Sequence, residues 1–441
     1  MKRDGAREAA LETLSACRRS GAWVDGALKQ TLRKKALGTR DAAFASRLAY
    51  GVMQNRIYLD RCLDRCLTQR TEKLEPLLLD LLRLGAYQLL FMDKVPSNAA
   101  VNETVEMAKA HGLTRAAGLV NAVLRGVDRR REEPLTFRDD LDALSVRMSH
   151  PRALVERMVS LLGAEEAEEF LLANNAPAPI TIHTNTLRSD DAALQSSLEE
   201  EGVRVTPHPW LPGCFTVSGT GSLESLRAWR EGKFLVQDAA ARLAALAADP
   251  KPGNFVIDVC AAPGGKSFAM SSLMNCKGKI LSCDMEEHKL QLMKLGAERL
   301  GIDCMEIRLM DGRSFREELA DAADVVLCDV PCSGLGIIRK KPDIRYKKLS
   351  TLTGLKEIQY AILENASRYV KPGGTLLYST CTVLPEENEG VTDRFLRTHD
   401  AFRAEEFTLP GPVGRVNGSI TLWPQRHGTD GFYICRMRRG R

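Results

Sequence analysis

The feature that most constrains this chain is a regular alternation, beyond Gly232, of short β-rich runs with helical segments. Strands that alternate with helices predict a doubly wound, mostly parallel sheet with helices on both faces. Two closely spaced runs near the end of the chain, SITLW and FYICRM, predict an antiparallel hairpin at the edge of that sheet. The runs assigned to parallel strands are FVIDV, KILSC, MEIRL, DVVLCD and TLLYST.

The first third of the chain has the pattern of helices instead. From Arg7 to about Arg131, apolar residues recur at spacings of three and four, which indicates amphipathic helices packed into an all-α domain. Pro76 suits a first helical turn, and the run Pro96–Asn98 interrupts the pattern. Residues from roughly 149 to 229 combine one helix with short strand-like runs, so we expect a small α+β connector there.

These patterns predict an all-α domain at residues 1–135, the connector at 145–230 and an α/β domain at 231–441. Basic residues are concentrated in the first of them. Residues 1–131 hold 24 Lys and Arg against 14 Asp and Glu, a net charge of +10, whereas the whole chain carries only +5. Such an asymmetry suggests nucleic acid as a partner, and a solvated basic face is the alternative.

Several classes of protein are excluded by what the sequence lacks. No uncharged apolar run reaches the roughly 18 residues that a membrane helix needs, and the first residues form no apolar leader, so we expect a cytoplasmic protein. The 12 cysteines include no CxxC pair, which argues against a structural zinc site and against a disulfide framework. We therefore expect reduced thiols and no metal.

The segment FVIDVCAAPGGKS, residues 255–267, runs from an apolar strand through a loop of small residues into an expected helix. Such a loop lets backbone amides approach a ligand at the helix N-terminus. Because it lacks the GxGxxG pattern and contains Pro263, a simple dehydrogenase is disfavoured. A turn that needs glycine only for steric reasons is the alternative.

Acidic residues close three later strands. Asp284 ends KILSCD, Asp311 follows MEIRLM and Asp329 ends DVVLCD. Ligands of open parallel sheets bind beyond the carboxyl ends of the strands, so these carboxylates are expected to line one crevice, with Asp284 placed to bind ribose hydroxyls. Each could instead cap a helix or form a turn.

Two cysteines also follow strands directly: Cys332 in DVVLCDVPCSGLG and Cys381 in LLYSTCTVLPEENEG. Loops at the ligand edge of a sheet are where chemistry usually takes place, which makes both thiols candidates for catalysis. Cys260, Cys283 and Cys328 lie within or next to strands and are expected to pack as small buried apolar side chains.

Three motifs in this order, DVCAAPGGK, DVPCSGLG and YSTCTVLPEENE, resemble those of the Nol1/Nop2/Sun family of RNA cytosine-5 methyltransferases. The stretches NAAVNETVEMAK and GLVNAVLRG are similar to the NusB-type RNA-binding domain. Together they resemble the RsmB type, which methylates small-subunit ribosomal RNA, and the likeness covers nearly the whole chain. It implies a NusB-like helical N-terminal domain and a Rossmann-like, class I C-terminal domain that uses S-adenosylmethionine.

The resemblance also implies roles for individual residues. Cys381 matches the nucleophile of the family, and Cys332 matches the cysteine that assists release of the product. Asp284 would hold the ribose of S-adenosylmethionine, Asp311 the adenine side, and Asp329 would face both the cofactor and the target base. The residues that would hold the methionine end of the cofactor are Cys260, Ala261, Ala262, Pro263, Gly264, Gly265 and Lys266.

The chemistry of the base requires such a thiol. Carbon 5 of cytosine is too weak a nucleophile to take a methyl group directly, so a Cys381 thiolate must first add to carbon 6. A free thiol has a pKa of about 8.5, and Lys266 is a candidate to favour the thiolate. Asp329 could donate or share a proton at N3, a role that needs a raised pKa. Cys332, or a water that it positions, could then accept the proton from carbon 5.

The target cytosine must be looped or flipped out of its surroundings to reach these groups. A basic run after Cys332 is expected to contact the neighbouring phosphates, with a solvated loop as the alternative. His183 stands where the family usually has arginine, and His427 is expected to face the RNA. The basic run comprises Arg339, Lys340, Lys341, Arg345, Lys347 and Lys348.

The substrate implied by the resemblance is 16S ribosomal RNA, methylated at position 967 before the subunit is fully assembled, by a monomeric enzyme. Transfer RNA or 23S ribosomal RNA are alternative substrates, and a noncatalytic ribosome-assembly factor that binds RNA is an alternative function. A methyltransferase for exocyclic amino groups would need no thiol. Its loop usually carries an aromatic residue after Asp-Pro-Pro or Asn-Pro-Pro, whereas this chain has DVPC.

Overall fold

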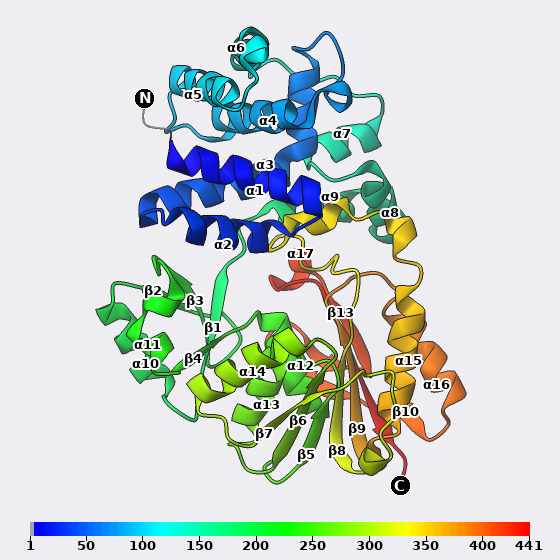
Figure 1. Cartoon of the computed structure of the whole chain (residues 1–441). Coiled ribbons are helices and arrows are strands. Elements are labelled where there is room, and N and C mark those ends of the chain that lie inside the picture. The colour runs from blue at the N-terminus through cyan, green and yellow to red at the C-terminus, as the bar shows by residue number, and fades with distance from the viewer. Residues whose placement is uncertain (1–3) are drawn as a thin grey trace. The chain divides into compact units, whose positions relative to one another are not determined.

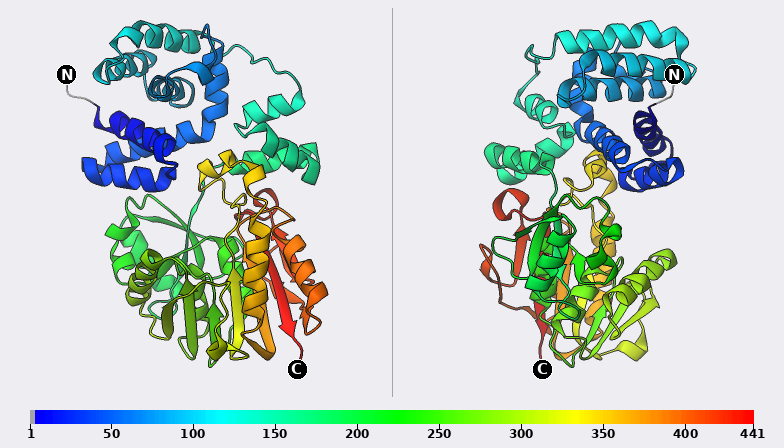
Figure 2. Two further views of the ribbon diagram at one scale, coloured as in Figure 1. Left: turned by 45° about the vertical axis from the view of Figure 1, so that its right-hand side comes forward. Right: turned by 90° about the vertical axis from the view of Figure 1, so that its left-hand side faces the viewer.

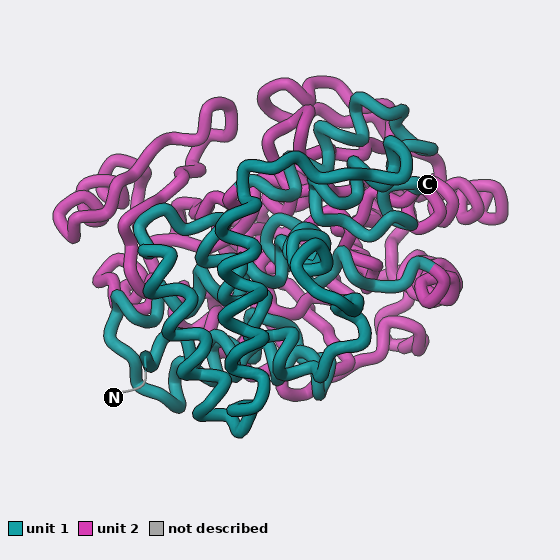
Figure 3. Tube along the Cα trace, turned by 90° about the horizontal axis from the view of Figure 1, so that it is seen from above, with its two compact units in different colours: residues 1–176, 338–349 teal, residues 177–337, 350–441 magenta. Residues whose placement is uncertain are grey.

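The computed structural model describes residues 4–441, which form two compact units. The first unit contains the residues up to Ala176 together with a short segment from much later in the chain, Ile338–Leu349, and the second contains the rest (Figure 3). Among the described residues, none of the helices is both long enough and apolar enough to cross a membrane.

The first unit is helical, as the apolar periodicity predicts. Asp4 caps the first helix by accepting hydrogen bonds from two backbone amides, and Pro76 occupies the first turn of the fourth. The helices pack closely: a Cβ atom at Gly51 would lie 2.0 Å from the ring of Tyr87, so only glycine fits there. The helices are α1 (Gly5–Ser20), α2 (Val24–Lys35), α3 (Thr39–Asp64), α4 (Pro76–Phe91), α5 (Ser97–Ala110), α6 (Ala117–Arg129), α7 (Asp140–Arg147), α8 (Arg152–Leu162) and α9 (Ala164–Asn175).

The late segment of the first unit corrects one prediction about RNA contacts. Arg345 lies in the 3-10 helix η5 (Pro342–Tyr346) and is only 1% exposed. Its Nη1 donates hydrogen bonds to the carbonyl oxygens of Gln54 and Ser149 and to the side-chain oxygen of Asn175. Burial lowers the pKa of Arg345 to about 10. Arg345 therefore stabilises the helical unit and does not grip a phosphate.

The second unit begins with a small four-stranded sheet that forms the expected connector. Its order is β2-β3-β1-β4 and every pairing is antiparallel. His183 on β1 is 1% exposed, its Nε2 lies 3.1 Å from the carbonyl oxygen of Gln237, and burial lowers the pKa of His183 to about 3. His183 is therefore a neutral core residue rather than an RNA contact. The elements are β1 (Ile180–Thr184), α10 (Asp191–Glu200), β2 (Arg204–Pro207), β3 (Cys214–Ser218), α11 (Arg227–Arg230) and β4 (Phe234–Val236).

The larger sheet has the order β10-β14-β9-β8-β5-β6-β7, with β13 also paired to β14 (Figure 1). The five strands from β9 to β7 are parallel, and they are the five predicted runs. The predicted antiparallel hairpin at the edge is confirmed: β14 pairs with β9 on one side, and on its other side β13 and β10 pair with successive parts of it as edge strands. The strands are β5 (Phe255–Asp258), β6 (Lys279–Asp284), β7 (Met305–Leu309), β8 (Ala323–Asp329), β9 (Val370–Thr380), β10 (Phe402–Ala404), β13 (Ser419–Leu422) and β14 (Phe432–Arg439).

Helices cover both faces of this sheet, as expected of a doubly wound fold (Figures 1 and 2). One face packs against α12 and α13 through residues such as Leu243 and Met270, and the other packs against α15 and α16 through Leu363 and Phe395. Because they are parallel, the strands β5, β6, β7, β8 and β9 all end at one common edge of the sheet. The remaining elements are α12 (Ala239–Ala248), α13 (Gly265–Leu273), α14 (Glu287–Leu300), α15 (Leu355–Ser367), α16 (Glu389–Thr398), β11 (Phe407–Leu409), β12 (Gly414–Val416) and α17 (Pro424–His427).

Candidate active site

The loop after β5 is held tightly against the neighbouring strand. The amide of Ala261 donates to the carbonyl oxygen of Cys283 at 2.7 Å, and the Ala262–Pro263 peptide is cis. Gly264 has a left-handed backbone with φ of 105°, and a Cβ atom there would lie 2.5 Å from the ring of Phe268. The loop thus needs glycine to lead into α13 at Gly265, with backbone amides at the helix N-terminus.

Asp284 lies beside this loop at the end of β6. Its Oδ2 accepts from the amide of Ala262 at 3.3 Å and its Oδ1 from the amide of Glu286 at 3.0 Å. Asp311 differs, because its carboxylate pairs with Arg313 at 2.7 Å. That guanidinium holds the pKa of Asp311 below its ordinary value. Both residues therefore form turns, and their contacts with a cofactor stay predictions.

Two further polar residues beside the loop were missed by sequence reasoning. Asp258, at the end of β5, is fully buried; its Oδ2 accepts from the Ser267 hydroxyl at 2.7 Å. Burial raises the pKa of Asp258 to about 7. Among the described residues its Oδ1 makes no hydrogen bond, and neither does the buried side-chain amide of Gln237, which lies near Gly265. Asp258 follows the strand-end pattern, whereas no sequence signal marks Gln237.

Lys266 and Asp329 form an ion pair at the centre of the carboxyl edge. Nζ of Lys266, on the first turn of α13, lies 2.6 Å from Oδ2 of Asp329, and the Ser379 hydroxyl donates to Oδ1 at 2.8 Å. Burial alone would lower the pKa of Lys266, but the charge of Asp329 and its hydrogen bond outweigh burial, and the pKa is raised. The Lys266 ammonium is thus a fixed positive charge in this site.

The two candidate cysteines are brought together beside this pair. Sγ of Cys332 lies 3.1 Å from Sγ of Cys381, and both are only half-buried. Their loops are linked by a hydrogen bond from the Gly336 amide to the Cys381 carbonyl and by a 2.6 Å bond between the Ser333 and Thr382 hydroxyls. The hydrogen bond with Cys381, followed by burial, raises the pKa of Cys332 well above its ordinary value.

A buried carboxylate supports the Cys332 loop, and sequence reasoning missed it as well. Glu387 is 1% exposed, and its Oε2 accepts from the amide of Ser333 and from Nε2 of Gln359, both at 2.9 Å. Its own backbone carbonyl accepts from the Tyr378 hydroxyl at 2.6 Å. Glu387 stands within the PEENE run, so its presence in a motif was visible although its contact with the other loop was not.

Residues 245–438 match the family described as 16S rRNA methyltransferase RsmB/F, residues 4–129 match the NusB family, and residues 150–224 match the ferredoxin-like domain of RsmF/B-like methyltransferases. The probable ribosomal RNA small subunit methyltransferase B of Bacillus subtilis is 35% identical to this chain, and the alignment covers both proteins completely. The chain belongs to the RsmB/F methyltransferase family.

Other members and a solved structure agree. Ribosomal RNA small subunit methyltransferase B of Erwinia tasmaniensis is 32% identical over 92% of each chain. The crystal structure of PH0851 superimposes with a TM-score of 0.83 at 28% identity, covering 100% of this chain and 99% of that one. As an RsmB/F methyltransferase the chain is a S-adenosylmethionine-dependent enzyme that methylates ribosomal RNA. The expected fold class, enzyme class and cofactor are confirmed.

The site of this RsmB/F methyltransferase fits S-adenosylmethionine. Two of its buried polar groups, Oδ1 of Asp258 and the side-chain amide of Gln237, make no hydrogen bond within residues 4–441, and both lie beside the loop that leads into the N-terminus of α13. Carboxylates suit an ammonium group and ribose hydroxyls, and Asp284 supplies a second carboxylate at the same loop. When bound, the cofactor supplies an electrophilic methyl group to the edge where the two cysteines lie.

Sequence reasoning therefore placed most of the site residues in one region. Cys332 and Cys381 meet, Lys266 pairs with Asp329, and Asp284 contacts the loop at 260–266. The expected RNA contact of His427 stays a prediction; in the structure its Nδ1 accepts from the Trp423 amide at 2.9 Å, and burial lowers the pKa of His427.

Proposed function

We propose that this enzyme methylates carbon 5 of the cytosine at position 967 of 16S ribosomal RNA through a covalent adduct between Cys381 and carbon 6. The observation that carries the proposal is the 3.1 Å approach of the Cys332 and Cys381 sulfurs at the cofactor edge of the sheet. A methyltransferase for amino groups needs no thiol. Methylation of carbon 5 needs a thiolate that adds to carbon 6 and a base that then removes the proton from carbon 5.

The hydrogen bond between the two thiols gives them different roles in the proposed reaction. The hydrogen bond with Cys381, followed by burial, raises the pKa of Cys332, so we assign the shared proton to Cys332 and the nucleophilic thiolate to Cys381. The ammonium of Lys266 lies within electrostatic reach of Cys381 and favours the same charge state. Cys381 then adds to carbon 6, which makes carbon 5 nucleophilic towards the methyl group.

Protons move at two atoms of the base. Addition of Cys381 places negative charge on the N3 side of the ring, where the Lys266–Asp329 pair can share a proton. After methyl transfer, carbon 5 loses its proton to Cys332 or to a water that Cys332 positions, and the sulfur of Cys381 leaves carbon 6. Glu387 holds the Cys332 loop in place through the Ser333 amide.

The RNA target and its context belong to the same proposal. We infer that the substrate is 16S ribosomal RNA, because the relatives carry small-subunit names and the basic N-terminal residues match the NusB family. We further propose that a monomer in the cytoplasm binds this RNA before the subunit is fully assembled. The competing substrates are transfer RNA and 23S ribosomal RNA. A noncatalytic assembly factor is disfavoured by the paired thiols.

Two measurements test the proposal. Bisulfite mapping of 16S ribosomal RNA from a deletion strain should show loss of one 5-methylcytosine, and a modification lost from transfer RNA or 23S RNA instead would refute the target. With the purified enzyme, Cys332→Ser should accumulate an RNA adduct that survives denaturing electrophoresis, whereas Cys381→Ser should lose both the adduct and methylation. Cys66→Ser, a half-buried thiol of the helical unit, is the matched control. An adduct in Cys381→Ser would reverse the roles.

A further inference from the structure

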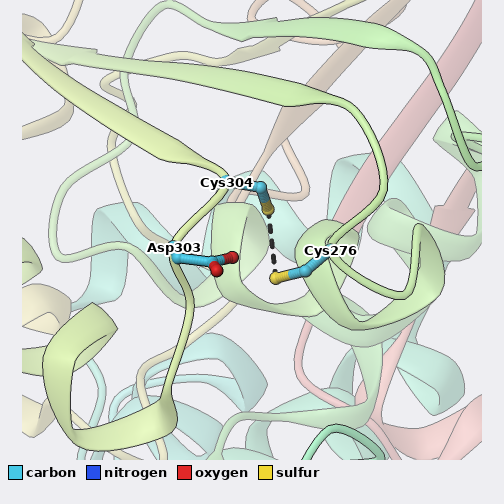
Figure 4. A group of neighbouring side chains, drawn as sticks. All are labelled: Cys276, Asp303 and Cys304. Carbon is cyan, nitrogen blue, oxygen red and sulfur yellow. Dashed lines mark hydrogen bonds between the residues drawn. The ribbon is translucent and has the colours of Figure 1, made fainter.

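A second close pair of thiols lies away from the catalytic cysteines. Sγ of Cys304 is 3.1 Å from Sγ of Cys276, and the side chain of Asp303 points towards both sulfurs (Figure 4). One donor atom from each of the three residues lies within 4.8 Å of the others. Cys276 precedes β6 and Cys304 directly precedes β7, so the cluster stands at the amino ends of these strands, opposite the catalytic edge.

Cys276 lies in a turn whose backbone has an uncommon, left-handed conformation. Asn275 and Cys276 both have left-handed backbone angles, with φ of 53° and 50°. Asparagine tolerates this conformation, but cysteine rarely adopts it, so the turn carries strain that its surroundings must compensate. The turn is fixed by hydrogen bonds from the Cys276 amide to the Ser271 carbonyl at 2.9 Å and from the Lys277 amide to the Met274 carbonyl at 3.0 Å.

The carboxylate of Asp303 distinguishes this cluster from an ordinary pair of buried cysteines. Cys276 and Cys304 are half-buried, Asp303 is exposed, and among the described residues Asp303 forms no ion pair or side-chain hydrogen bond. Two thiols and a free carboxylate are a donor set for a thiophilic divalent cation. A disulfide would need the two sulfurs alone and would give Asp303 no role.

The distance between the sulfurs is compatible with such a cation. Two sulfurs bound to one tetrahedral zinc at about 2.3 Å lie about 3.8 Å apart, so the observed 3.1 Å requires a separation of about 0.7 Å. The side chains can accommodate this by small χ1 rotations. A disulfide, at about 2.05 Å, would instead require the sulfurs to approach by about 1 Å.

We propose that Cys276, Cys304 and Asp303 bind one Zn²⁺, with water as the fourth ligand. Binding releases the two thiol protons, and the two thiolates and the carboxylate together carry three negative charges, so the zinc site with its water has a net charge of −1. The ion joins the turn after α13 to the start of β7 and so stabilises the half of the sheet that carries the cofactor loop. This proposal departs from the sequence-based expectation of no metal, and it is independent of the proposed reaction.

Zinc titration of the full chain tests the site. Because the catalytic cysteines are an equally close thiol pair, the titration is carried out in a Cys332→Ser/Cys381→Ser background. Competition with a chromophoric chelator gives the stoichiometry and affinity, and Cd²⁺ gives an ultraviolet thiolate-to-metal band. Cys276→Ser, Cys304→Ser and the exposed, conservative Asp303→Asn are compared with Cys66→Ser, which removes a half-buried thiol elsewhere.

We expect one Zn²⁺ per chain, a Cd²⁺ band, and no response to Mg²⁺. Loss of a group that only supports a metal ligand costs about 10–100-fold in affinity, so each Cys→Ser change should cost at least about 100-fold and Asp303→Asn about tenfold or more, whereas Cys66→Ser should cost nothing. Absence of stoichiometric zinc would overturn the proposal. So would unchanged affinity in Asp303→Asn, or isolation of the reduced-buffer protein with a Cys276–Cys304 disulfide.

Discussion

The ion pair between Lys266 and Asp329 makes the catalytic edge sensitive to removal of either charge. The side chains are 13% and 27% exposed, and Nζ lies 2.6 Å from the carboxylate. Breaking a fully buried pair costs about 3–5 kcal/mol, because the remaining charge is left unpaired. Since solvent reaches part of this pair, we expect Lys266→Met and Asp329→Asn each to cost about 2–3 kcal/mol of local stability.

The double variant separates the effect of charge from that of packing. Lys266→Met/Asp329→Asn leaves neither charge unpaired, so we expect it to cost only about 1 kcal/mol, which corresponds to a coupling free energy of about 3–5 kcal/mol. Stability is read by hydrogen exchange in peptides of α13 and β8, which reports this unit without requiring two-state unfolding of the whole chain. The ion pair of Arg394 with Glu357 is solvent-exposed at 2.8 Å and is the matched control, for which no coupling is expected.

The same variants should affect catalysis differently from stability. All three variants should lose kcat/KM by about 30- to 150-fold: the two that contain Lys266→Met lack the ammonium that favours the Cys381 thiolate, and Asp329→Asn lacks the carboxylate that shares a proton on the N3 side of the base. The pKa of Lys266 is raised above 10.5, so the stabilising contribution is constant near neutral pH and is lost only as pH rises through that higher value. Single variants that cost less than about 0.5 kcal/mol, or singles whose losses simply add, would refute the reasoning.

Two further predictions concern buried charges outside the pair. Burial raises the pKa of Asp258 to about 7, far above the value of about 3.9 for an unfolded carboxyl, so the stability of the protein should fall as pH rises from about 4 through 7. Asp258→Asn should make the melting temperature less dependent on pH in this range. The same variant should bind the cofactor more weakly in calorimetry. Arg345→Met should remove a buried donor that three acceptors share and destabilise the helical unit by about 2–4 kcal/mol. Hydrogen exchange around Gln54 measures the second effect, and unchanged protection there would contradict it.

The parallel part of the fold could be predicted because its signals are local. The strands of a covered sheet are continuous apolar runs, and the residues that end them must stand at one edge, so Asp284 and Asp329 could be assigned to the ligand side directly. The short strand β10 could not be predicted, because its three residues carry no strand pattern and pair with the last residues of β14, more than 30 positions later in the chain.

Other errors arose because burial depends on residues far apart in the chain. Arg345 stands in a run of basic residues that reads as exposed, yet its hydrogen-bond acceptors come from positions 54, 149 and 175. The Cys276–Cys304 pair was invisible to a search for CxxC spacing, because 27 residues separate the two thiols. Glu387 was visible as a residue of a motif, but its contact with the Ser333 amide crosses 54 positions.

The meeting of the two catalytic cysteines, in contrast, follows from strand register. β8 and β9 are adjacent and parallel, and Asp329 pairs with Ser379 at the end of the ladder. Cys332 follows Asp329 by three residues and Cys381 follows Ser379 by two, so both thiols lie just beyond the same edge of the sheet, at the ends of adjacent strands. The helical crossover through α15 makes β8 and β9 neighbours. Any change that shifts this register by one residue should therefore separate the sulfurs and abolish methylation while leaving the cofactor loop after β5 intact.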